Sequence, residues 1–234
     1  DMLPADQWLT IDRYALALTR DLQARVTADY DQYEFHRVVQ ALQHFASEDL
    51  GAFYLDVLKD RLYTTAPGSH ARRSAQSALW HITQTLVRLM APVLAFTAEE
   101  IWTVLGDKAA DSVMLTTWHV LPEQADEAAL MARWSRIRAL RAESARVLES
   151  LRSEGGIGSS LQAEVEVRAA GELHDDLAAL GDDLRFVLIT LAASLLKADS
   201  EAEQGVTARP STHAKCARCW HYRADVGSHA EHPE

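Results

Sequence analysis

The sequence predicts a mainly α-helical protein that continues into a small α/β unit and ends in a short motif with two cysteines. Apolar residues recur at three- and four-residue steps through much of the first 152 residues. Apolar and polar residues then alternate strictly over residues 161–168, as expected of a strand with one buried face. Cys216 and Cys219, the only cysteines among 234 residues, lie close together near the end. This length allows a helical domain with a smaller appendage.

Two amphipathic helices are expected at the start of the chain. The apolar residues of segment 8–26 form one stripe along a long helix. Asp31 and Glu34 are typical of the first residues of a second helix, which Pro67 and Gly68 end. The apolar stripe of this second helix contains Phe35, Val38, Val39, Leu42, Phe45 and Phe53.

Two more helices are expected before the middle of the chain. One begins near Ser69 and ends before Pro92, because the residue preceding a proline avoids the helical conformation. Residues 97–100 form a T-x-x-E capping box for a short helix, which Gly106 can end in the left-handed conformation. Four amphipathic helices joined by short breaks predict a helical bundle over residues 1–122.

Segment 123–156 is expected to be a connecting basic helix that ends at Gly155 and Gly156. Its apolar residues at helical spacing are predicted to face inward: Leu130, Trp134, Ile137, Leu148 and Leu151. Its arginines are predicted to face mostly outward: Arg133, Arg136, Arg138, Arg141, Arg146 and Arg152.

A small α/β unit is predicted over residues 157–199. The alternating strand 161–168 is followed by a short helix around residues 173–180. The apolar run 184–191 suits a second strand, although a buried helix fits the same pattern. Residues 200–212 are polar and contain a glycine and a proline, which indicates a linker within the terminal region 200–234.

The net charge of −11 weighs against a nucleic-acid partner, because affinity for a polyanion depends largely on Lys and Arg. Two segments are locally basic: residues 131–152, and residues 204–224, which contain no acid. Such basic footprints are compatible with a nucleic-acid partner. Solvated surface charge explains them equally well.

No catalytic constellation is visible in the sequence. Gly-rich phosphate loops, nucleophile elbows and helical metal-binding His pairs are missing. No apolar stretch reaches the roughly 18 residues that a membrane span needs, so no membrane partner is expected. The first residues resemble neither a signal peptide nor a start at Met, which suggests a piece of a longer protein. Two cysteines make no disulfide framework, and a cytoplasmic protein is expected.

Cys216 and Cys219 form a C-x-x-C motif, in which two thiolates can bind one zinc ion from a tight turn. A redox dithiol is a weaker alternative, because the motif does not open a helix in a βαβ unit. The motif supplies only half of a tetrahedral site. Arg218 and Trp220 suit single-stranded RNA, since bases stack on aromatic rings and cations meet phosphates. Packing of Trp220 inside a metal-stabilised knuckle is an equal alternative.

Many segments resemble bacterial isoleucyl-tRNA synthetases. The segments similar to their anticodon-binding helical bundle are 33–36 (YEFH), 53–63 (FYLDVLKDRLY), 72–76, 86–92 and 96–102 (FTAEEIW). Two more, 157–163 and 184–188, resemble the C-terminal junction domain of these enzymes, and 215–222 resembles their terminal zinc-binding knuckle. The resemblance covers almost the whole chain.

The resemblance implies a C-terminal, tRNA-binding part of a class I ligase that attaches isoleucine to its tRNA using ATP. The catalytic H-I-G-H and K-M-S-K-S motifs of the family are absent, so this part alone is not expected to be catalytic. As a monomer, it would hold the anticodon stem-loop of isoleucine tRNA.

The resemblance also implies site residues. The family knuckle holds zinc with four cysteines, of which Cys216 and Cys219 are present, so the sequence contains a half-site and a truncated knuckle. Arg218 and Trp220 match knuckle positions expected to contact RNA. Basic residues near a helix junction of the bundle are weaker candidates: Lys59, Arg61, Arg72 and Arg73.

A different class of function remains open at this point. The chain would then be a stand-alone helical interaction module that has kept the bundle but has no RNA role. The acidic net charge and the half-site favour this alternative.

Overall fold

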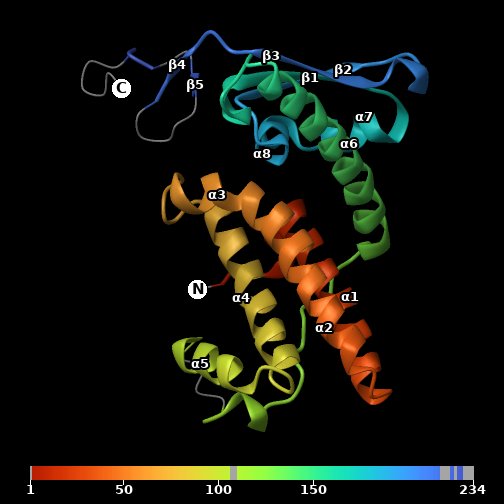
Figure 1. The fold of residues 1–234 in the computed structure, drawn as a ribbon, viewed down its shortest axis with the longest axis vertical. Helices are drawn as coiled ribbons and strands as arrows, with labels where there is room; N and C mark the ends of the chain where they lie inside the picture. The colour runs from red at the N-terminus through yellow and green to blue at the C-terminus, as the bar shows by residue number, and fades with distance from the viewer. Residues whose placement is uncertain (1, 106–109, 217–221, 224–225, 229–234) are drawn as a thin grey trace. The chain divides into compact units, whose positions relative to one another are not determined.

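A computed structural model describes residues 2–105, 110–216, 222–223 and 226–228 (Figure 1). The chain divides into two compact units, Asp1–Met131 and Ala132–Glu234. The first is helical and the second contains a small sheet, so the predicted fold class, mainly α with a small α/β part, is confirmed. Within the described ranges, no helix has the length and apolar character required to cross a membrane.

The first unit is built from long helices that begin at the N-terminal end of the chain. In chain order these are α1 (Thr10–Asp31), α2 (Phe35–His44), a π-helical segment (Phe45–Leu55), α3 (Asp56–Tyr63), α4 (His70–Met90) and α5 (Ala95–Leu105). Helix α1 packs against α2 and α4. The predicted stripe of α1 is confirmed, because Ile11, Ala15, Leu22 and Val26 are all buried.

The second predicted helix is one continuous stretch made of α2, the π-helical segment and α3. Two details of the prediction were wrong. Asp31 does not cap it, because α1 extends to Asp31 and the break falls at Tyr33, which has a φ of 59°. Phe35 and Val39 are exposed, since the buried line of α2 runs from Val38 towards the π-helical segment.

Helix α4 begins and ends where the sequence predicted. Ser69 is its N-cap and accepts a hydrogen bond from the backbone N–H of Arg72 at 3.4 Å, and the helix ends at Met90, before Pro92. The predicted capping box of the next helix was wrong. Because α5 already begins at Ala95, Thr97 lies inside it and cannot be the cap. Gly106, predicted to end α5, lies outside the described residues.

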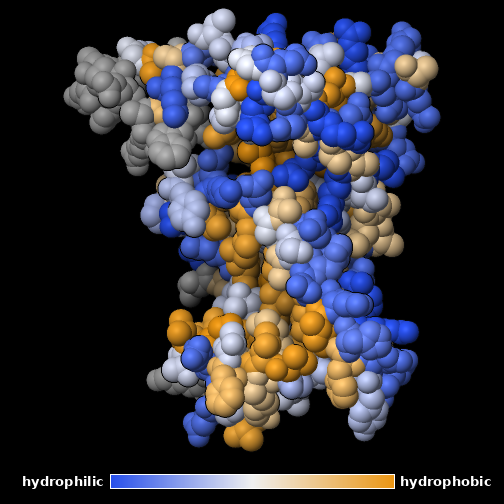
Figure 2. All heavy atoms as spheres, viewed as in Figure 1, coloured by the Kyte–Doolittle hydropathy of each residue, from blue (hydrophilic) through white to orange (hydrophobic). Residues whose placement is uncertain are grey.

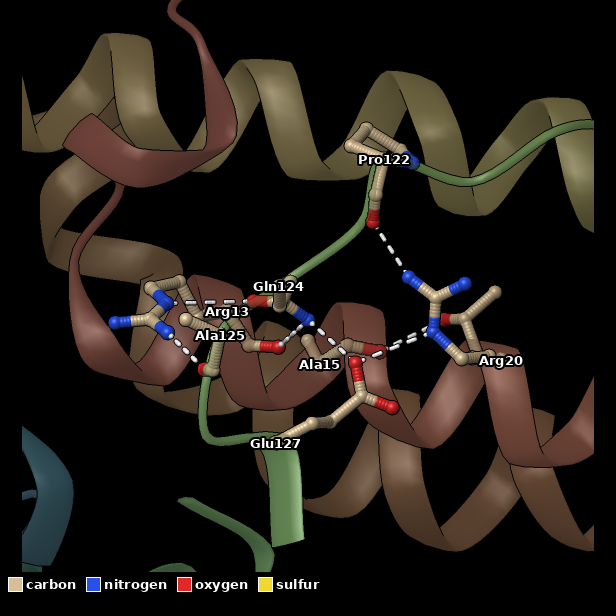
Figure 3. Close-up of polar contacts among 8 residues, drawn as sticks. Arg13, Ala15, Arg20, Pro122, Gln124, Ala125 and Glu127 are labelled. Carbon is tan, nitrogen blue, oxygen red and sulfur yellow. Dashed lines mark hydrogen bonds and ion pairs between the residues drawn. The ribbon is translucent and has the colours of Figure 1, made fainter. Parts of the chain in front are cut away.

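An extended segment returns along α1 before the next helix (Figure 3). Arg13 Nη2 donates to the carbonyl of Ala125 at 2.9 Å, and Gln124 Nε2 donates to the carbonyl of Arg13 at 3.0 Å. Two turns further along α1, Arg20 Nε contacts Glu127 Oε2 at 3.1 Å and Arg20 also binds the carbonyl of Pro122. Side chains of α1 therefore hold the segment that leads into α6.

Helix α6 (Glu127–Ser153) begins in the first unit and continues into the second. Its predicted inward residues Leu130, Trp134, Ile137 and Leu148 are buried. Gly155 follows the helix with a φ of 80°, which fits the predicted helix end.

The second unit contains a three-stranded sheet in the order β2-β1-β3. Strand β1 (Ala163–Ala169) pairs in parallel with β2 (Ala192–Lys197) and antiparallel with β3 (Gly205–Pro210). The predicted alternation of β1 is confirmed, because every second residue from Ala163 is buried. Two short helices connect β1 to β2, α7 (Gly171–Ala178) and α8 (Leu184–Leu188), and a hairpin of β4 (Ala214–Lys215) and β5 (Tyr222–Arg223) follows the sheet.

Two predictions for this unit were wrong. The apolar run 184–191, expected as a strand, begins with helix α8, which Ile189 ends in the left-handed conformation. The sheet strand starts only at Ala192. The expected linker 200–212 contains strand β3, whose polar residues become ordered by pairing with β1. The sequences of residues 184–191 and 200–212 do not indicate the distant residues with which each segment packs or pairs.

Candidate nucleic-acid interface

The cations predicted from the bundle lie on the two helices that flank the turn between α3 and α4. Lys59 and Arg61 belong to α3, and Arg72 and Arg73 lie in the first turn of α4. Inside the turn, Ser69 Oγ donates to Thr65 Oγ1 at 3.1 Å. This turn is therefore an ordered platform with basic residues on both sides.

Lys59 is the most accessible of these cations, with 68% of its side chain exposed. Its Nζ lies 2.7 Å from Asp56 Oδ1, and this hydrogen bond raises the pKa of Lys59. Exposed pairs of this kind contribute little to stability. Lys59 can therefore exchange Asp56 for a phosphate at small cost.

Arg72 and Arg73 are half-buried at the N-terminal end of α4. Arg72 Nη1 donates to the carbonyl of Thr65 at 3.3 Å, which holds the guanidinium against the turn. The Nε of Arg72 is buried and has no hydrogen-bond partner within the described part of the chain. The positive end of the α4 dipole adds to these charges, so this end of the helix attracts anions.

Arg61 differs from the other three because only 3% of it is exposed. It lies near a buried polar network in which the Asp12 carboxylate accepts hydrogen bonds from Tyr54 Oη at 2.6 Å and Ser74 Oγ at 2.5 Å. Burial and the charge of Asp12 raise the pKa of Tyr54 well above its usual value, while Arg61 opposes this shift. Arg61 thus occupies the interior of the bundle.

The sequence reasoning did not find this network. It joins α1, the π-helical segment and α4 through Asp12, Tyr54 and Ser74. The sequence contained one signal of this network, since Asp12 interrupts the apolar pattern of α1. The structure shows that this carboxylate is fully buried. Part of the family-like sequence around Tyr54 therefore serves the interior of the bundle.

The basic segment of α6 is largely committed to contacts inside the second unit. Arg133 Nε and Arg136 Nε contact the two oxygens of Asp176 at 3.2 and 2.6 Å, and Arg136 also reaches Glu172 at 2.9 Å. Further along, Arg141 Nε donates to the carbonyl of Val187 at 3.0 Å. The arginines of α6 were expected to face mostly outward, and these three are partly exposed although they bind partners within the second unit. They attach α7 and the end of α8 to α6.

The second basic segment is also partly neutralised. Arg209 of β3 contacts Glu164 Oε2 of β1 at 2.8 Å, and Ser211 Oγ donates to Glu164 Oε1 at 3.0 Å. The Arg209 hydrogen bond lowers the pKa of Glu164, and Ser211 and His213 add to this effect. Arg209 therefore links two strands of the sheet.

The predicted zinc knuckle lies at the β4–β5 hairpin. Lys215 pairs with Tyr222 across the hairpin, and Cys216 directly follows β4, so the C-x-x-C motif occupies the connection between the two strands. Cys219, Arg218 and Trp220 lie outside the described residues. Two thiolates separated by two residues in the sequence can supply half of a tetrahedral zinc site. Within the described part of the chain, no three His, Cys, Asp or Glu residues gather to form a metal site.

Comparison with known proteins agrees with the resemblance seen in the sequence. Residues 12–167 match the family described as "Anticodon-binding domain of tRNA ligase", and residues 215–234 match the family described as "Zinc finger found in FPG and IleRS".

The chain is also similar along its whole length to isoleucine–tRNA ligases. It is 62% identical to that of Aromatoleum aromaticum over 234 residues, 60% to that of Azoarcus sp. and 63% to that of Dechloromonas aromatica, each over 233 residues. In each case, the match covers 100% of this chain and 25% of the relative. The chain thus spans about a quarter of the length of these relatives.

The first of the family matches includes nearly all of α1, all of α2 to α6 and most of β1, well over half of the chain. The predicted similarity to bacterial isoleucyl-tRNA synthetases is confirmed by the relatives. The chain belongs to the anticodon-binding domain family of tRNA ligases.

Proposed function

We propose that this chain is the tRNA-binding, C-terminal part of a bacterial isoleucine–tRNA ligase and that it holds the anticodon stem-loop of isoleucine tRNA. The observation that carries the proposal is the match of residues 12–167 to the anticodon-binding family, together with 62% identity to an isoleucine–tRNA ligase along the whole chain. In the whole ligase, a separate catalytic part would join isoleucine to the tRNA using ATP. The ligase would act in the cytoplasm as a monomer.

The proposed division of labour follows the regions of the chain. Residues 1–122 form the bundle that meets the tRNA, residues 123–156 connect it, and residues 157–199 form a junction domain. Residues 200–234 carry the knuckle. Within the bundle, the accessible cations at the α3–α4 turn would meet phosphates: Lys59, Arg72 and Arg73. Arg61 would support them from the interior.

The knuckle would provide the second contact with the tRNA. Zinc bound by Cys216 and Cys219, with further ligands outside the half-site, would fix the hairpin connection. Trp220 would then stack on an unpaired base and Arg218 would meet the backbone. In this proposal the orientation of Trp220 would depend on the metal.

Binding of the chain to isoleucine tRNA, measured by fluorescence anisotropy over a series of salt concentrations, tests the proposal. We expect affinity that falls with salt, because phosphate contacts release counterions. Trp220→Ala should weaken binding by about 1–3 kcal/mol, the usual contribution of one stacked base. Trp80→Ala is the matched control, because Trp80 is a partly exposed tryptophan that belongs to α4 and not to the knuckle segment.

Undetectable or salt-insensitive binding would contradict the proposed function. Equal affinity for isoleucine tRNA and for an unrelated tRNA would contradict the assignment to the isoleucine system. Equal effects of Trp220→Ala and Trp80→Ala would remove the knuckle from the interface.

A further inference from the structure

Exposed apolar side chains concentrate at one end of the helical unit, away from the cations of the α3–α4 turn. Among the described residues, sixteen large apolar side chains are exposed, and eight of them come from two short segments. Figure 2 shows apolar side chains gathered over α5 and the chain beside it. We call these eight residues the α5 patch: Val93, Leu94, Phe96, Val104, Met114, Leu115, Trp118 and Val120.

The α5 patch is an ordered surface. Beneath it lies a core cluster of Val87, Ala91, Ala98, Trp102 and Val113, all buried. Trp102 Nε1 donates to the carbonyl of Ala110 at 3.0 Å, and the Ser112 hydroxyl hydrogen-bonds to Glu99, so both segments are fixed to one another.

The exposure within the patch is unusually complete. Phe96 is 89% exposed, and Val104 and Val120 are each 86% exposed. Scattered apolar residues are normal on a surface, but soluble monomers rarely expose contiguous apolar patches of more than a few hundred Å². A cavity of about 450 Å³ lies beside the patch, lined by Arg88, Ala110 and residues 115–120. It offers space for an inserted apolar side chain.

The charges of the patch decide against RNA as its occupant. Residues 93–105 and 110–120 contain no Lys or Arg, whereas they contain Glu99, Glu100 and Asp111. Arg88 lines the adjacent cavity, where it donates hydrogen bonds to Gln84 and lies over the ring of Trp102. A surface that binds the phosphate backbone needs cations. The patch therefore suits an apolar protein surface.

We propose that the α5 patch docks against the rest of the ligase polypeptide, the three quarters of the relatives' length that lie outside this chain. The proposal rests on the proposed function, that the chain is part of an isoleucine–tRNA ligase. The whole of this chain aligns with only 25% of the length of the Aromatoleum aromaticum relative. In a ligase of that length, the remaining three quarters would offer a large protein surface within the same molecule. Apolar contacts between two parts of one chain would fix the tRNA-binding bundle relative to the catalytic part.

A chimera tests the docking. This chain replaces the matching quarter of the Aromatoleum aromaticum ligase, and hydroxyl-radical labelling without tRNA compares side-chain exposure in the chimera and in the chain alone. We expect labelling of Phe96, Leu115 and Val120 to fall at least about fivefold in the chimera, because the centre of an interface excludes water. Tyr33, 79% exposed outside the patch, should label equally in both.

Variants connect the protection to the patch itself. In the chimera, Phe96→Glu should return the labelling of Val120 to the level of the chain alone. The matched control is Val39→Glu, because Val39 is 45% exposed on α2, and it should leave the protection intact.

Equal labelling of the patch in the chimera and in the chain would overturn the proposal. Labelling of the chain alone that falls as its concentration rises would also overturn it, since the occupant would then be a second copy. Binding of isoleucine tRNA is measured on the same samples. Loss of tRNA binding with a protected patch contradicts only the proposed function, whereas tRNA binding with an unprotected patch contradicts only the docking.

Discussion

Two arginine-rich regions of the chain have opposite structural roles. On α6, Arg133 and Arg136 bind the nearly buried carboxylate of Asp176. At the α3–α4 turn, Arg72 bonds a backbone carbonyl and Lys59 contacts only a partly exposed Asp56. The α6 arginines are committed to folding the second unit, while the cations of the turn remain accessible to a polyanion.

The difference shows why local charge in a sequence does not identify a binding surface. The α6 segment has six arginines within residues 131–152 and was one of the two locally basic segments of the sequence. Its partner Asp176 lies 40 residues beyond Arg136 and is drawn in only by the packing of α7. A basic residue is available to RNA if no nearly buried acid of the fold holds it, and an exposed pair such as Lys59–Asp56 can be exchanged for a phosphate at small cost.

The largest expected effect is that of Asp176→Ala. The substitution removes the carboxylate that Arg133 and Arg136 share. The side chain of Asp176 is 8% exposed, and those of Arg133 and Arg136 are 41% and 37% exposed. Breaking a fully buried pair costs about 3–5 kcal/mol, and the loss here should be smaller because both arginines are partly exposed. Urea unfolding followed by circular dichroism measures the change.

Its matched control is the neighbouring substitution Asp175→Ala. The Asp175 side chain is 86% exposed, so this variant should change the free energy of unfolding by less than about 0.5 kcal/mol. Similar stabilities of the two variants would show that the α6 arginines are not committed to the fold.

Predictions of the fold succeeded where the signals are local in the sequence and failed where the structure depends on residues far apart in the chain. Helices α1 and α4 were predictable because a stripe at three- and four-residue steps, a serine cap and Pro92 are all local signals. Strand β3 and helix α8 were not, because pairing with β1 and the left-handed Ile189 are not visible in their composition. The π-helical segment continues an amphipathic pattern that an α-helix would also give.

The candidate site was predictable to a smaller degree. The sequence reasoning found the C-x-x-C motif from the spacing of its cysteines and chose basic residues near a helix junction of the bundle, and the positions of Lys59 and Arg72 fit the proposed role. It could not separate Arg61 from Lys59, two residues apart on α3, because only the fold buries one and exposes the other. Burial depends on the partner helix, which no local pattern specifies.

A smaller effect is expected from Tyr54→Phe, which tests the interior role of the region around Arg61. The substitution removes the hydrogen bond to the buried carboxylate of Asp12. Loss of this hydrogen bond should destabilise the chain by about 1.5 kcal/mol, the lower end of the usual range for a bond to a charged group, because Ser74 still donates to Asp12. Tyr63→Phe, at an 81% exposed residue of α3, should be neutral by the same urea assay. Neutral behaviour of Tyr54→Phe would contradict the network.

The smallest effect concerns pH and Arg209. The folded state lowers the pKa of Glu164, mainly through Arg209, so this contribution to stability is present above the unfolded value of about 4.5 and is lost as pH falls through the folded pKa. Arg209→Gln should make the decline in melting temperature between pH 6 and pH 3 shallower.

Arg168→Gln provides the comparison for this measurement. Arg168 lies on the same strand as Glu164 but contacts Glu166 at 3.3 Å, so the variant should keep the steeper decline. If the melting temperatures of both variants decline with pH as steeply as that of the unsubstituted chain, Arg209 does not hold the two strands together through Glu164.

The central claim is that tRNA is bound through the α3–α4 turn, and the salt dependence of isoleucine-tRNA binding tests it most directly. The triple variant Lys59→Ala, Arg72→Ala, Arg73→Ala should reduce the slope of log affinity against log salt by about 2–3, since each lost phosphate contact accounts for about 0.7–0.9. Arg133→Ala should leave the slope unchanged, because Arg133 is bound to Asp176. An unchanged slope in the triple variant, together with a reduced slope in Arg133→Ala, would contradict the account.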